Sequence, residues 1–384
     1  MHVLFLPKWY PGRNDPQLGD FIRKQALAVS GSVRTSVLFI HPLEGLERTR
    51  LFEEHTDGDL WELFAWYRAS RASWAPWRKL VNLRRYTAAA RAGRRRVLQA
   101  RGPIDLVQAY ILVRPALLAR RWMRRFGTPY IVSEQSSQYL DGTYATRPKV
   151  QLRLMRDLVR DARALTVVSD RLGQAMRGFG LADHYTVVPN PIPGLDRPLP
   201  LPGPVGAFLV VADLVDRTKN VSGVLRALAA ARATDTRAGL TVIGDGPDRR
   251  ALEALAATLG IRDHVRFLGR LANSDVLEHM ARAFCVVVNS RVETFSVVTG
   301  EGLASGRPVI ASRCGGPEAF LTPENGILVP VEDDAALADA MRQVMRNAAA
   351  YDPAMIRRDL ATRFSTDVVV QRLMDVYRTA TGHG

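Results

Sequence analysis

The sequence has few cysteines and no long uncharged apolar run. Its two cysteines, Cys285 and Cys314, lie in apolar or glycine-flanked stretches, and their spacing fits neither a disulfide framework nor a metal site. No segment approaches the ~18 uncharged apolar residues of a membrane-spanning helix. The apolar start, MHVLFLP, is too short for the apolar core of a signal peptide. We therefore expect a protein of a reducing, cytoplasmic compartment.

Motifs of several common enzyme classes are absent as well. The seven histidines are scattered without an H-x-x-x-H pair, so we expect no metal ion. Neither a G-x-G-x-x-G fingerprint nor a P-loop occurs, which removes support for a nicotinamide enzyme or an ordinary ATPase. The G-x-S-x-G elbow of serine hydrolases is also missing. We expect no bound cofactor.

The positive charge of the chain is concentrated in its first half. Residues 1–195 contain 31 Lys and Arg against 16 Asp and Glu, whereas residues 196–384 contain 22 of each. Arginine is frequent in both halves, so a genomic preference for arginine does not by itself explain the asymmetry. Arginines that simply occupy solvated faces remain the plain alternative.

Residues 64–125 hold 16 basic residues and a single acid, Asp105, together with several tryptophans and tyrosines. The stretch from Trp74 to Gln99 predicts a helix with a cationic face and aromatic residues near its start. Such a surface suits an anionic membrane surface. It also suits a nucleic acid, and the composition leaves both partners open.

The order of apolar segments predicts two α/β domains. In both halves, short runs rich in β-branched residues alternate with amphipathic helical stretches, which is typical of a parallel sheet with helices on both faces. Residues 191–206 hold six prolines and predict a linker. We expect domains over residues 1–190 and 207–364, with a C-terminal helix at about 365–380 that packs back on the first domain. A cleft between two such domains would be a natural ligand site.

Two glutamates follow the predicted strand FCVVVNS of the second half. Glu293 lies in the loop that follows this strand, and Glu301 lies eight positions later in GEGLASG, a predicted short helix that ends at Gly306. Open α/β sheets bind ligands at this edge. Helix amides suit phosphate, and carboxylates suit sugar hydroxyls. The alternative is a solvated loop residue followed by an ordinary acidic helix start.

Other predicted strand ends carry glycines or cations. Arg217 and Lys219 lie after the strand AFLVVADL, where cations can neutralise a leaving phosphate. Gly244 begins a glycine-containing loop after another strand, and Gly269 ends a further strand where backbone atoms could meet a flat base. Near the amino end, Gly19 precedes a helix and lets a backbone amide approach a diphosphate. Each could be a plain turn or a solvated charge run, but their common placement favours a binding site.

The second half resembles the retaining, GT-B-fold glycosyltransferases of family 4, also called glycosyltransferase group 1. The resemblance is carried by VIGDGPDRRALEALAATLGIRDHVRFLGRL, by the E-x7-E spacing from Glu293 to Glu301, and by EGLASGRPVIASRCGGPEAF followed by ENGILVP. The first half matches more loosely, through FLPKWYPGRNDPQLGDFIRKQALAVS, PYIVSEQSSQYL and VVSDRLGQAM. The resemblance implies two Rossmann-like, doubly wound domains that face each other across a cleft.

The resemblance also implies a division of roles. The second domain would bind a nucleotide-sugar donor and the first an acceptor. Glu301 would bond the ribose and Glu293 the transferred sugar, while Lys219 with Arg217 would stabilise the departing diphosphate. Backbone groups near the donor would come from Gly19, Gly244, Gly269, Phe295, Ser296 and Val297.

Two positions depart from the family pattern. Asp213 stands where family members usually have arginine, so Arg217 would have to substitute or the phosphate grip would be rearranged. Gln135 stands where many relatives have histidine. A glutamine can bond a sugar hydroxyl but cannot titrate, so we expect no general base there.

Together with these observations, the resemblance implies a metal-independent, retaining hexosyltransferase. It would move a sugar from a UDP- or GDP-sugar to a lipid-linked or saccharide acceptor in cell-surface polysaccharide or glycolipid biosynthesis. We expect it to be peripheral on the inner face of the cytoplasmic membrane. The alternatives are a sugar-nucleotide epimerase on the same fold and a basic nucleic-acid-binding protein, of which the second leaves the glutamates and glycine loops unexplained.

Overall fold

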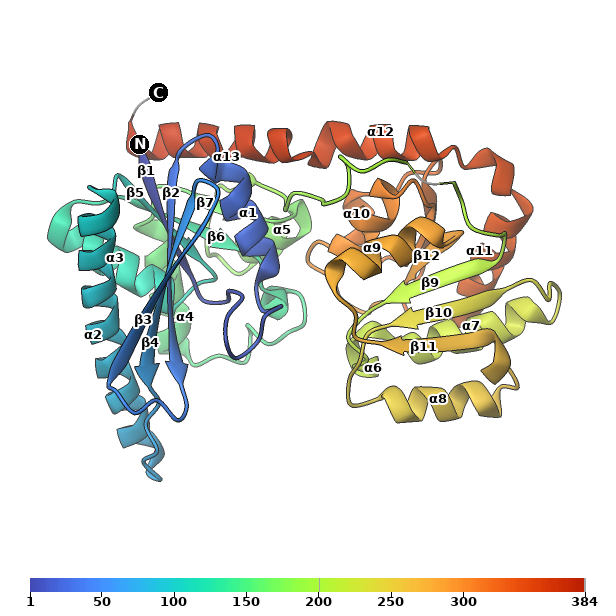
Figure 1. The fold of residues 1–384 in the computed structure, drawn as a ribbon, viewed down its shortest axis with the longest axis horizontal. Coiled ribbons are helices and arrows are strands. Elements are labelled where there is room, and N and C mark those ends of the chain that lie inside the picture. The colour runs from blue at the N-terminus through green and yellow to red at the C-terminus, as the bar shows by residue number, and fades with distance from the viewer. Residues whose placement is uncertain (200, 383–384) are drawn as a thin grey trace. The chain divides into compact units, whose positions relative to one another are not determined.

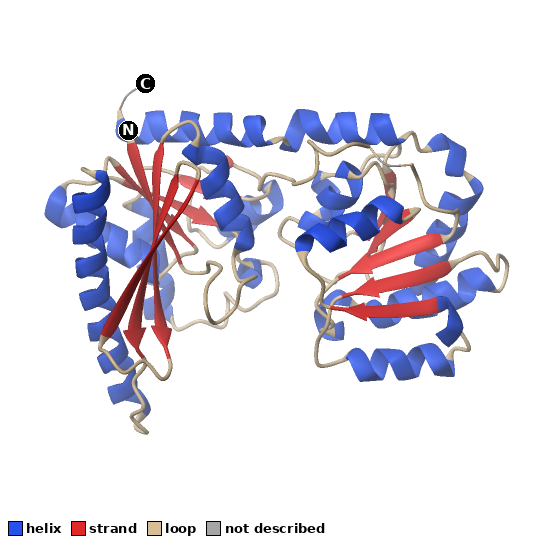
Figure 2. Cartoon of the chain, viewed as in Figure 1, coloured by secondary structure: helices blue, strands red, loops and turns tan. Residues whose placement is uncertain are grey.

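The chain folds into two compact α/β units. The structure is a computed structural model that describes residues 1–199 and 201–382. The first unit comprises Met1–Pro191 together with the chain from Thr366 onward, and the second comprises Ile192–Ser365 (Figure 1). Each unit is built around its own sheet (Figure 2).

The first unit contains an eight-stranded sheet with the order β3-β4-β2-β1-β5-β6-β7-β8. Its neighbouring strands are parallel except for β3, which runs antiparallel to β4. The strands are β1 (His2–Pro7), β2 (Arg34–Leu43), β3 (Arg50–Asp57), β4 (Leu60–Arg68), β5 (Leu106–Tyr110), β6 (Tyr130–Glu134), β7 (Leu165–Val167) and β8 (Thr186–Val187).

The hairpin of β3 and β4 corrects the prediction of a wholly parallel sheet. β3 is an edge strand whose outer half, EHTD, is polar and exposed, so its sequence carries little strand signal. β4 is almost fully buried, as expected of a strand with neighbours on both sides. An edge strand whose outer half is polar can be located only by its pairing, which the sequence does not show.

Helices cover both faces of this sheet. The helices of the first unit are α1 (Asp20–Ser30), α2 (Ala75–Arg101), α3 (Arg114–Phe126), α4 (Lys149–Arg160), α5 (Asp170–Gly178), α13 (Thr366–Thr381) and the short η1 (Ser137–Tyr139). Figure 1 shows α1 and α13 on one side of the strands and α2 and α3 on the other. α13 comes from the end of the chain, and its Tyr377 is fully buried in the same core as β1 and α1.

The second unit contains a six-stranded sheet with the order β11-β10-β9-β12-β13-β14, and every neighbouring pair is parallel. The strands are β9 (Ala207–Val211), β10 (Gly239–Ile243), β11 (Val265–Gly269), β12 (Cys285–Val288), β13 (Val309–Ser312) and β14 (Gly326–Val329). The chain builds outward from β9 to β11 and then returns to the other side of β9. The point where the strand order reverses therefore lies between β9 and β12.

Helices connect these strands in the right order for a doubly wound fold. They are α6 (Asp216–Lys219), α7 (Val221–Arg232), α8 (Arg249–Thr258), α9 (Asn273–Arg282), α10 (Val297–Ala304), α11 (Asp334–Arg346) and α12 (Pro353–Phe364), with the short η2 (Arg262–His264), η3 (Pro317–Ala319) and η4 (Ala348–Ala350). β12 is buried along its whole length, CVVV, as its run of β-branched residues predicts. No helix in the described part of the chain is long and apolar enough to cross a membrane.

The proline-rich stretch 191–206, expected to be a linker, divides between the two units. Pro191 ends the first unit, and the chain from Ile192 onward belongs to the second. The amide of Gly203 donates to the carbonyl oxygen of Ala283 at 3.2 Å, which holds this part of the stretch against the second unit. Pro200 lies outside the described residues.

Candidate functional site

The loops that follow β9 and β12 meet at the reversal of strand order in the second unit. Phe208 and Leu209 of β9 pair directly with Cys285 and Val286 of β12. The carboxyl ends of these parallel strands consequently open side by side, which is where open α/β sheets hold their ligands. Most of the residues singled out in the second half emerge at this edge.

Lys219 and Glu293 form an ion pair across these two loops. The Lys219 Nζ lies 2.5 Å from the Glu293 Oε1, and the Ser290 hydroxyl donates to the same oxygen at 2.8 Å. The side chains are 28% and 18% exposed, so the pair is shielded but still reachable from solvent. Burial works against the ammonium charge, but Glu293 and then Asp213 outweigh it, and the pKa of Lys219 is raised. Lys219 therefore carries its positive charge at neutral pH.

A third loop fixes the backbone of Glu293. Its amide donates to the carbonyl oxygen of Cys314 at 3.0 Å, and the residue forms a parallel bridge with Gly315. These two residues follow β13, so the loops after three adjacent strands converge on Glu293. Such backbone support gives the carboxylate a defined position before any ligand arrives.

Arg291 holds the same loops together, and sequence reasoning missed it. Its amide and guanidinium donate to the carbonyl oxygens of Thr218 (2.8 Å) and Asp216 (2.6 Å) and to the side chains of Asn220 (3.2 Å) and Glu332 (2.6 Å). It thus ties the loop after β12 to the loop after β9. Its position between a buried strand and Glu293 was the only signal in the sequence.

Arg217 does not join the Lys219–Glu293 pair, although it lies on the same short helix, α6. Its side chain is exposed, and within the described residues no hydrogen bond or ion pair joins it to either member of the pair. Asp213 is also exposed, and its carboxylate lies 3.7 Å from the guanidinium of Arg270. Arg270 directly follows β11 and is a second cation of this edge that the sequence analysis did not single out.

Glu301 lies in the second turn of α10 and is only 4% exposed. Its Oε1 accepts a hydrogen bond from the side chain of Asn273, the first residue of α9, at 3.4 Å. This burial argues against a merely solvated carboxylate at a helix start. A buried carboxylate needs hydrogen-bonding partners, so this position holds the Glu301 carboxylate as a hydrogen-bond acceptor.

The start of α10 presents backbone rather than side chains. The Phe295 ring is buried against Phe320 and Phe364, so only its backbone remains for a ligand. Ser296 adopts a left-handed conformation with φ 66° and turns the chain into the helix, which begins at Val297. Amides at the start of a helix favour an anion.

Gly244 and Gly269 have a packing role at this edge. A Cβ on Gly244, whose φ is 133°, would lie 1.8 Å from the carbonyl oxygen of Ala212. Its amide donates to the carbonyl oxygen of Gly269 at 2.8 Å. The two glycines therefore bring the loops after β9, β10 and β11 close together. This close packing accounts for glycine at the two positions without any ligand.

The first unit carries Gly19 in the loop between β1 and α1, and Gln135 at the carboxyl end of β6. Gly19 has φ 70° and precedes α1, and a Cβ there would lie 2.5 Å from the backbone of Trp9. The Gln135 and Asn190 side-chain amides exchange two hydrogen bonds of 3.0 and 2.9 Å. Gln135 is thereby held in one orientation at the edge of this sheet.

Glu134, next to Gln135, is a further residue that the sequence analysis did not single out. It is fully buried and accepts hydrogen bonds from the amides of Leu112, Gln135 and Ser136 and from the Tyr139 hydroxyl. Burial raises the pKa of Glu134, and these hydrogen bonds oppose the rise. The carboxylate fixes the loop that carries Gln135.

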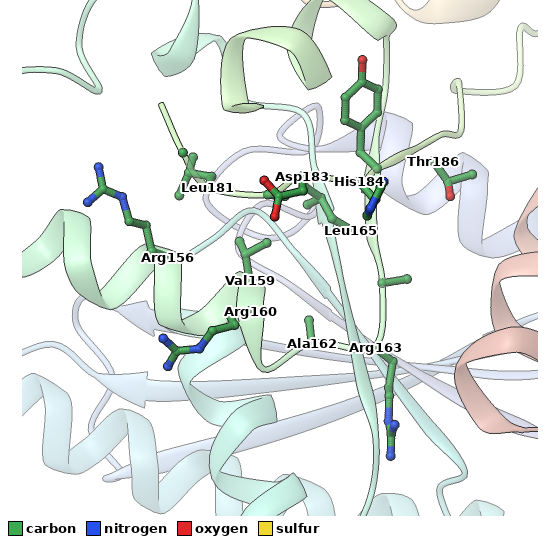
Figure 3. A pocket seen from close by; sticks show the side chains of 14 residues that line it. Arg156, Val159, Arg160, Ala162, Arg163, Leu165, Leu181, Asp183, His184 and Thr186 are labelled. Atoms are coloured by element: carbon green, nitrogen blue, oxygen red, sulfur yellow. The ribbon is translucent and has the colours of Figure 1, made fainter. Parts of the chain in front are cut away.

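A cavity of about 590 Å³ in the first unit lies away from these residues. It is lined by the end of α4 and by Leu165 and Thr186, the first residues of β7 and β8, so it sits at the opposite edge of the sheet from Gln135. Figure 3 shows that Arg156, Arg160 and Arg163 point in different directions rather than toward a common centre. The cavity therefore lacks a convergent anion site.

Comparisons with known proteins identify the family. The model described as "Glycosyl transferases group 1" matches residues 206–347, and that of the "Glycosyl transferase 4-like domain" matches residues 41–191. The chain belongs to the group 1 glycosyltransferases. This confirms the family that the sequence motifs indicated.

Two relatives of the glycosyltransferase family illustrate the likeness. The chain is 32% identical over 231 residues to the lipopolysaccharide core biosynthesis glycosyltransferase LpsD of Rhizobium meliloti, covering 56% of this chain and 64% of LpsD. It is 34% identical over 183 residues to the D-inositol 3-phosphate glycosyltransferase of Saccharomonospora viridis, covering 45% and 42% of the two chains. The chain spans about half the length of the curated relatives it matches.

Solved structures of other proteins share the fold. Sucrose-phosphate synthase from Thermosynechococcus elongatus superposes with a TM-score of 0.76 at 18% identity, over 100% of both chains. HepE from Anabaena, in complex with UDP, gives a TM-score of 0.70 at 16% identity, over 98% of this chain and 99% of HepE. These likenesses confirm the predicted GT-B fold class.

Proposed function

We propose that this glycosyltransferase takes a hexose from a UDP- or GDP-sugar and that its second unit binds this donor. The observation that carries the proposal is the Lys219–Glu293 ion pair at the reversal of strand order between β9 and β12. A cation and a carboxylate placed side by side suit a ligand that has a diphosphate next to a sugar. The HepE structure, which contains UDP, supports the same class of donor.

The residues around the pair suggest a role for each part of the donor. Glu301 would bond the ribose hydroxyls, and Glu293 would bond hydroxyls of the transferred sugar. The amides that begin α10 at Val297 would meet the phosphate. Lys219 would exchange part of its contact with Glu293 for the leaving diphosphate, and Arg217 would add a second cation from the flexible end of its side chain.

The proposed chemistry retains the configuration of the sugar and uses no metal ion. The bond between the anomeric carbon and the diphosphate oxygen breaks, and the acceptor oxygen forms its bond on the same face. The proton of the acceptor hydroxyl passes to the departing phosphate oxygen, so no side chain has to act as a base. Cations and helix amides stabilise the developing negative charge.

The acceptor is proposed to be a saccharide or a lipid-linked saccharide that binds the first unit. Gln135, fixed by Asn190, would hold an acceptor hydroxyl at the end of β6. LpsD acts in lipopolysaccharide core biosynthesis, which supports a role in surface polysaccharide or glycolipid biosynthesis at the cytoplasmic face of the membrane.

Sugar transfer from a panel of labelled donors tests this function. We expect one UDP- or GDP-sugar to give a labelled product with the retained anomeric configuration, in the presence of EDTA as in its absence. Glu293→Ala should lose the activity, and the exposed Glu253→Ala of α8 should keep it. Conversion of the nucleotide-sugar to its epimer without sugar transfer would show that the protein is an epimerase and would contradict the proposal. Loss of transfer on adding EDTA would contradict metal independence.

A further inference from the structure

The start of α2 is exposed on all sides and strongly apolar. Every residue from Ser73 to Leu80 is exposed, and Figure 1 shows this end of α2 extending past the ends of the strands. The exposed fractions of its large apolar side chains are 67% for Trp74, 48% for Trp77, 40% for Leu80 and 57% for Leu83. Clustered exposure of this kind marks an interaction surface.

This end of the helix contributes little to the packing of the unit. The buried residues of α2 are Ala89, Ala90, Gly93 and Val97, all in its second half. The first half therefore extends from a helix that the second half already anchors to the sheet. Folding alone does not explain two tryptophans there, since exposed tryptophans gain nothing from the core.

The sequence on either side of this apolar end carries charge almost entirely of one sign. Between Glu62 and Glu134 the only acidic residue is Asp105. The nearest cations are Arg71, Arg78, Lys79, Arg84 and Arg85, and none of them forms an ion pair within the described residues. Unpaired cations beside exposed tryptophans are the composition of helices that lie at an anionic lipid interface.

A groove between α2 and α3 continues the surface. Its volume is about 370 Å³, and it combines apolar and cationic side chains: Leu83, Tyr86, Leu117, Leu118, Arg114, Arg120, Arg121 and Arg124. Leu117 on α3 is itself 38% exposed. Arg120 and Arg124 pair with Asp161, whereas Arg114 and Arg121 form no ion pair within the described residues. Apolar side chains beside such arginines suit an amphiphile that carries negative charge next to a hydrocarbon chain.

We propose that this α2–α3 surface, made of Trp74, Trp77, Leu80, Leu83, Leu117 and the surrounding arginines and Lys79, docks on an anionic lipid bilayer. The tryptophans insert at the level of the headgroups, and the cations bind lipid phosphates and carboxylates. Leu80 and Leu83 favour the bilayer over a nucleic acid, because exposed aliphatic side chains find hydrocarbon in lipid and only water in a nucleic-acid groove. None of these residues belongs to the donor site, so the proposal stands independently of the proposed transferase activity.

Co-sedimentation with lipid vesicles tests the apolar part. The full-length protein should bind vesicles of phosphatidylcholine with phosphatidylserine at low salt, and bind vesicles of phosphatidylcholine alone far less. The double change Trp74→Ala and Trp77→Ala should weaken binding by at least about tenfold. The matched control is Val150→Ala with Met355→Ala, at apolar side chains that are 81% and 54% exposed elsewhere. That control should bind like the wild type.

A charge-reversal pair tests the electrostatic part. Lys79→Glu with Arg84→Glu should weaken binding to anionic vesicles by at least about tenfold and flatten its salt dependence. The control, Arg250→Glu with Arg266→Glu, makes the same change in net charge at exposed arginines of the second unit and should bind nearly as the wild type does. An equal loss of vesicle binding in both double variants would assign the attraction to the net charge of the protein and overturn the proposed docking surface.

Fluorescence quenching decides how the surface binds. Brominated lipids in anionic vesicles should quench the wild type, and the change Trp74→Phe with Trp77→Phe should remove most of that quenching while vesicle binding persists. No binding, or equal binding to neutral and anionic vesicles, would overturn the proposal. Binding of duplex DNA that the same variants abolish, without vesicle binding, would assign the surface to a nucleic acid instead.

Discussion

Lys219 lies near two carboxylates, and the proposed chemistry requires it to stabilise the leaving diphosphate. Its ammonium contacts Glu293 at 2.5 Å, and Asp213 also raises its pKa. A diphosphate that leaves between these loops would find the cation already charged and positioned. This preorganisation is the property that makes electrostatic stabilisation effective in a transition state.

Replacement of Lys219 should therefore act mainly on kcat. We expect Lys219→Met to lower the kcat of sugar transfer by about 10²–10³, the range for loss of one preorganised donor to a developing charge. Arg250→Met, at an exposed arginine of α8, is the control and should leave kcat unchanged. Thermal unfolding of the variant shows whether the fold is intact. A folded Lys219→Met protein with kcat within threefold, ~0.7 kcal/mol, of wild type would contradict the role.

The same residue predicts a change of stability with pH. Because Glu293 and Asp213 raise the folded-state pKa of Lys219 above its usual value of 10.5, the ion pair stabilises the fold fully below that value. The stabilisation is lost as the pH rises through the folded pKa. Urea unfolding should show a constant gap in unfolding free energy between wild type and Lys219→Met from neutral pH to about pH 9, and a smaller gap above 10.5. A gap that persists unchanged through the alkaline range would argue against the pair.

At the residue scale, sequence reasoning identified the charged groups but not what positions them. Glu293, Glu301 and Lys219 stand out by type and spacing. Arg291 and Arg270 do not, because an arginine in an arginine-rich chain carries no signal until its partners are known. The reciprocal amide pair of Gln135 and Asn190 joins residues far apart in the sequence, and only the fold brings them together.

At the scale of elements, the loops after β9, β10 and β11 depend on glycine packing. Gly244→Ala would drive a Cβ into the carbonyl oxygen of Ala212, now 1.8 Å from that position, and strain a backbone at φ 133°. We expect it to destabilise the protein by about 3 kcal/mol or more. Gly178→Ala, at a helical glycine with nothing within 4 Å, should change stability by less than about 1 kcal/mol. Equal urea midpoints for the two variants would contradict this account.

Most elements follow from local patterns, and those that do not have identifiable causes. Buried strands such as β12 are continuous apolar runs, and α3 alternates leucine and arginine at helical spacing. β3 is polar and defined by its antiparallel partner, so no periodicity predicts it. β14 is only four residues long, and its sequence GILV is too short to separate a strand from an extended loop.

At the scale of the whole molecule, the chain has the two α/β units that the sequence predicted on either side of a proline-rich stretch. Family membership and the GT-B fold class apply to both units together. The return of α13 to the first unit was predicted from one amphipathic segment at the chain end, and it places Val369, Leu373 and Tyr377 in that core. The residues of the site indicate a class of donor and acceptor rather than one sugar, because backbone amides and carboxylates bind the phosphates and hydroxyls that all nucleotide-sugars have in common.

Binding of a nucleoside diphosphate by the second unit is the central claim, and thermal unfolding with UDP, GDP and ADP tests it most directly. At about 100 times its Kd, one of UDP or GDP should raise the Tm of the full-length wild type by about 5 °C. The same ligand should raise the Tm of Glu301→Gln or Lys219→Met much less, and that of the Arg250→Met control as much as wild type. The absence of a shift with any of the three nucleotides, or an equal shift in all four proteins, would contradict the account.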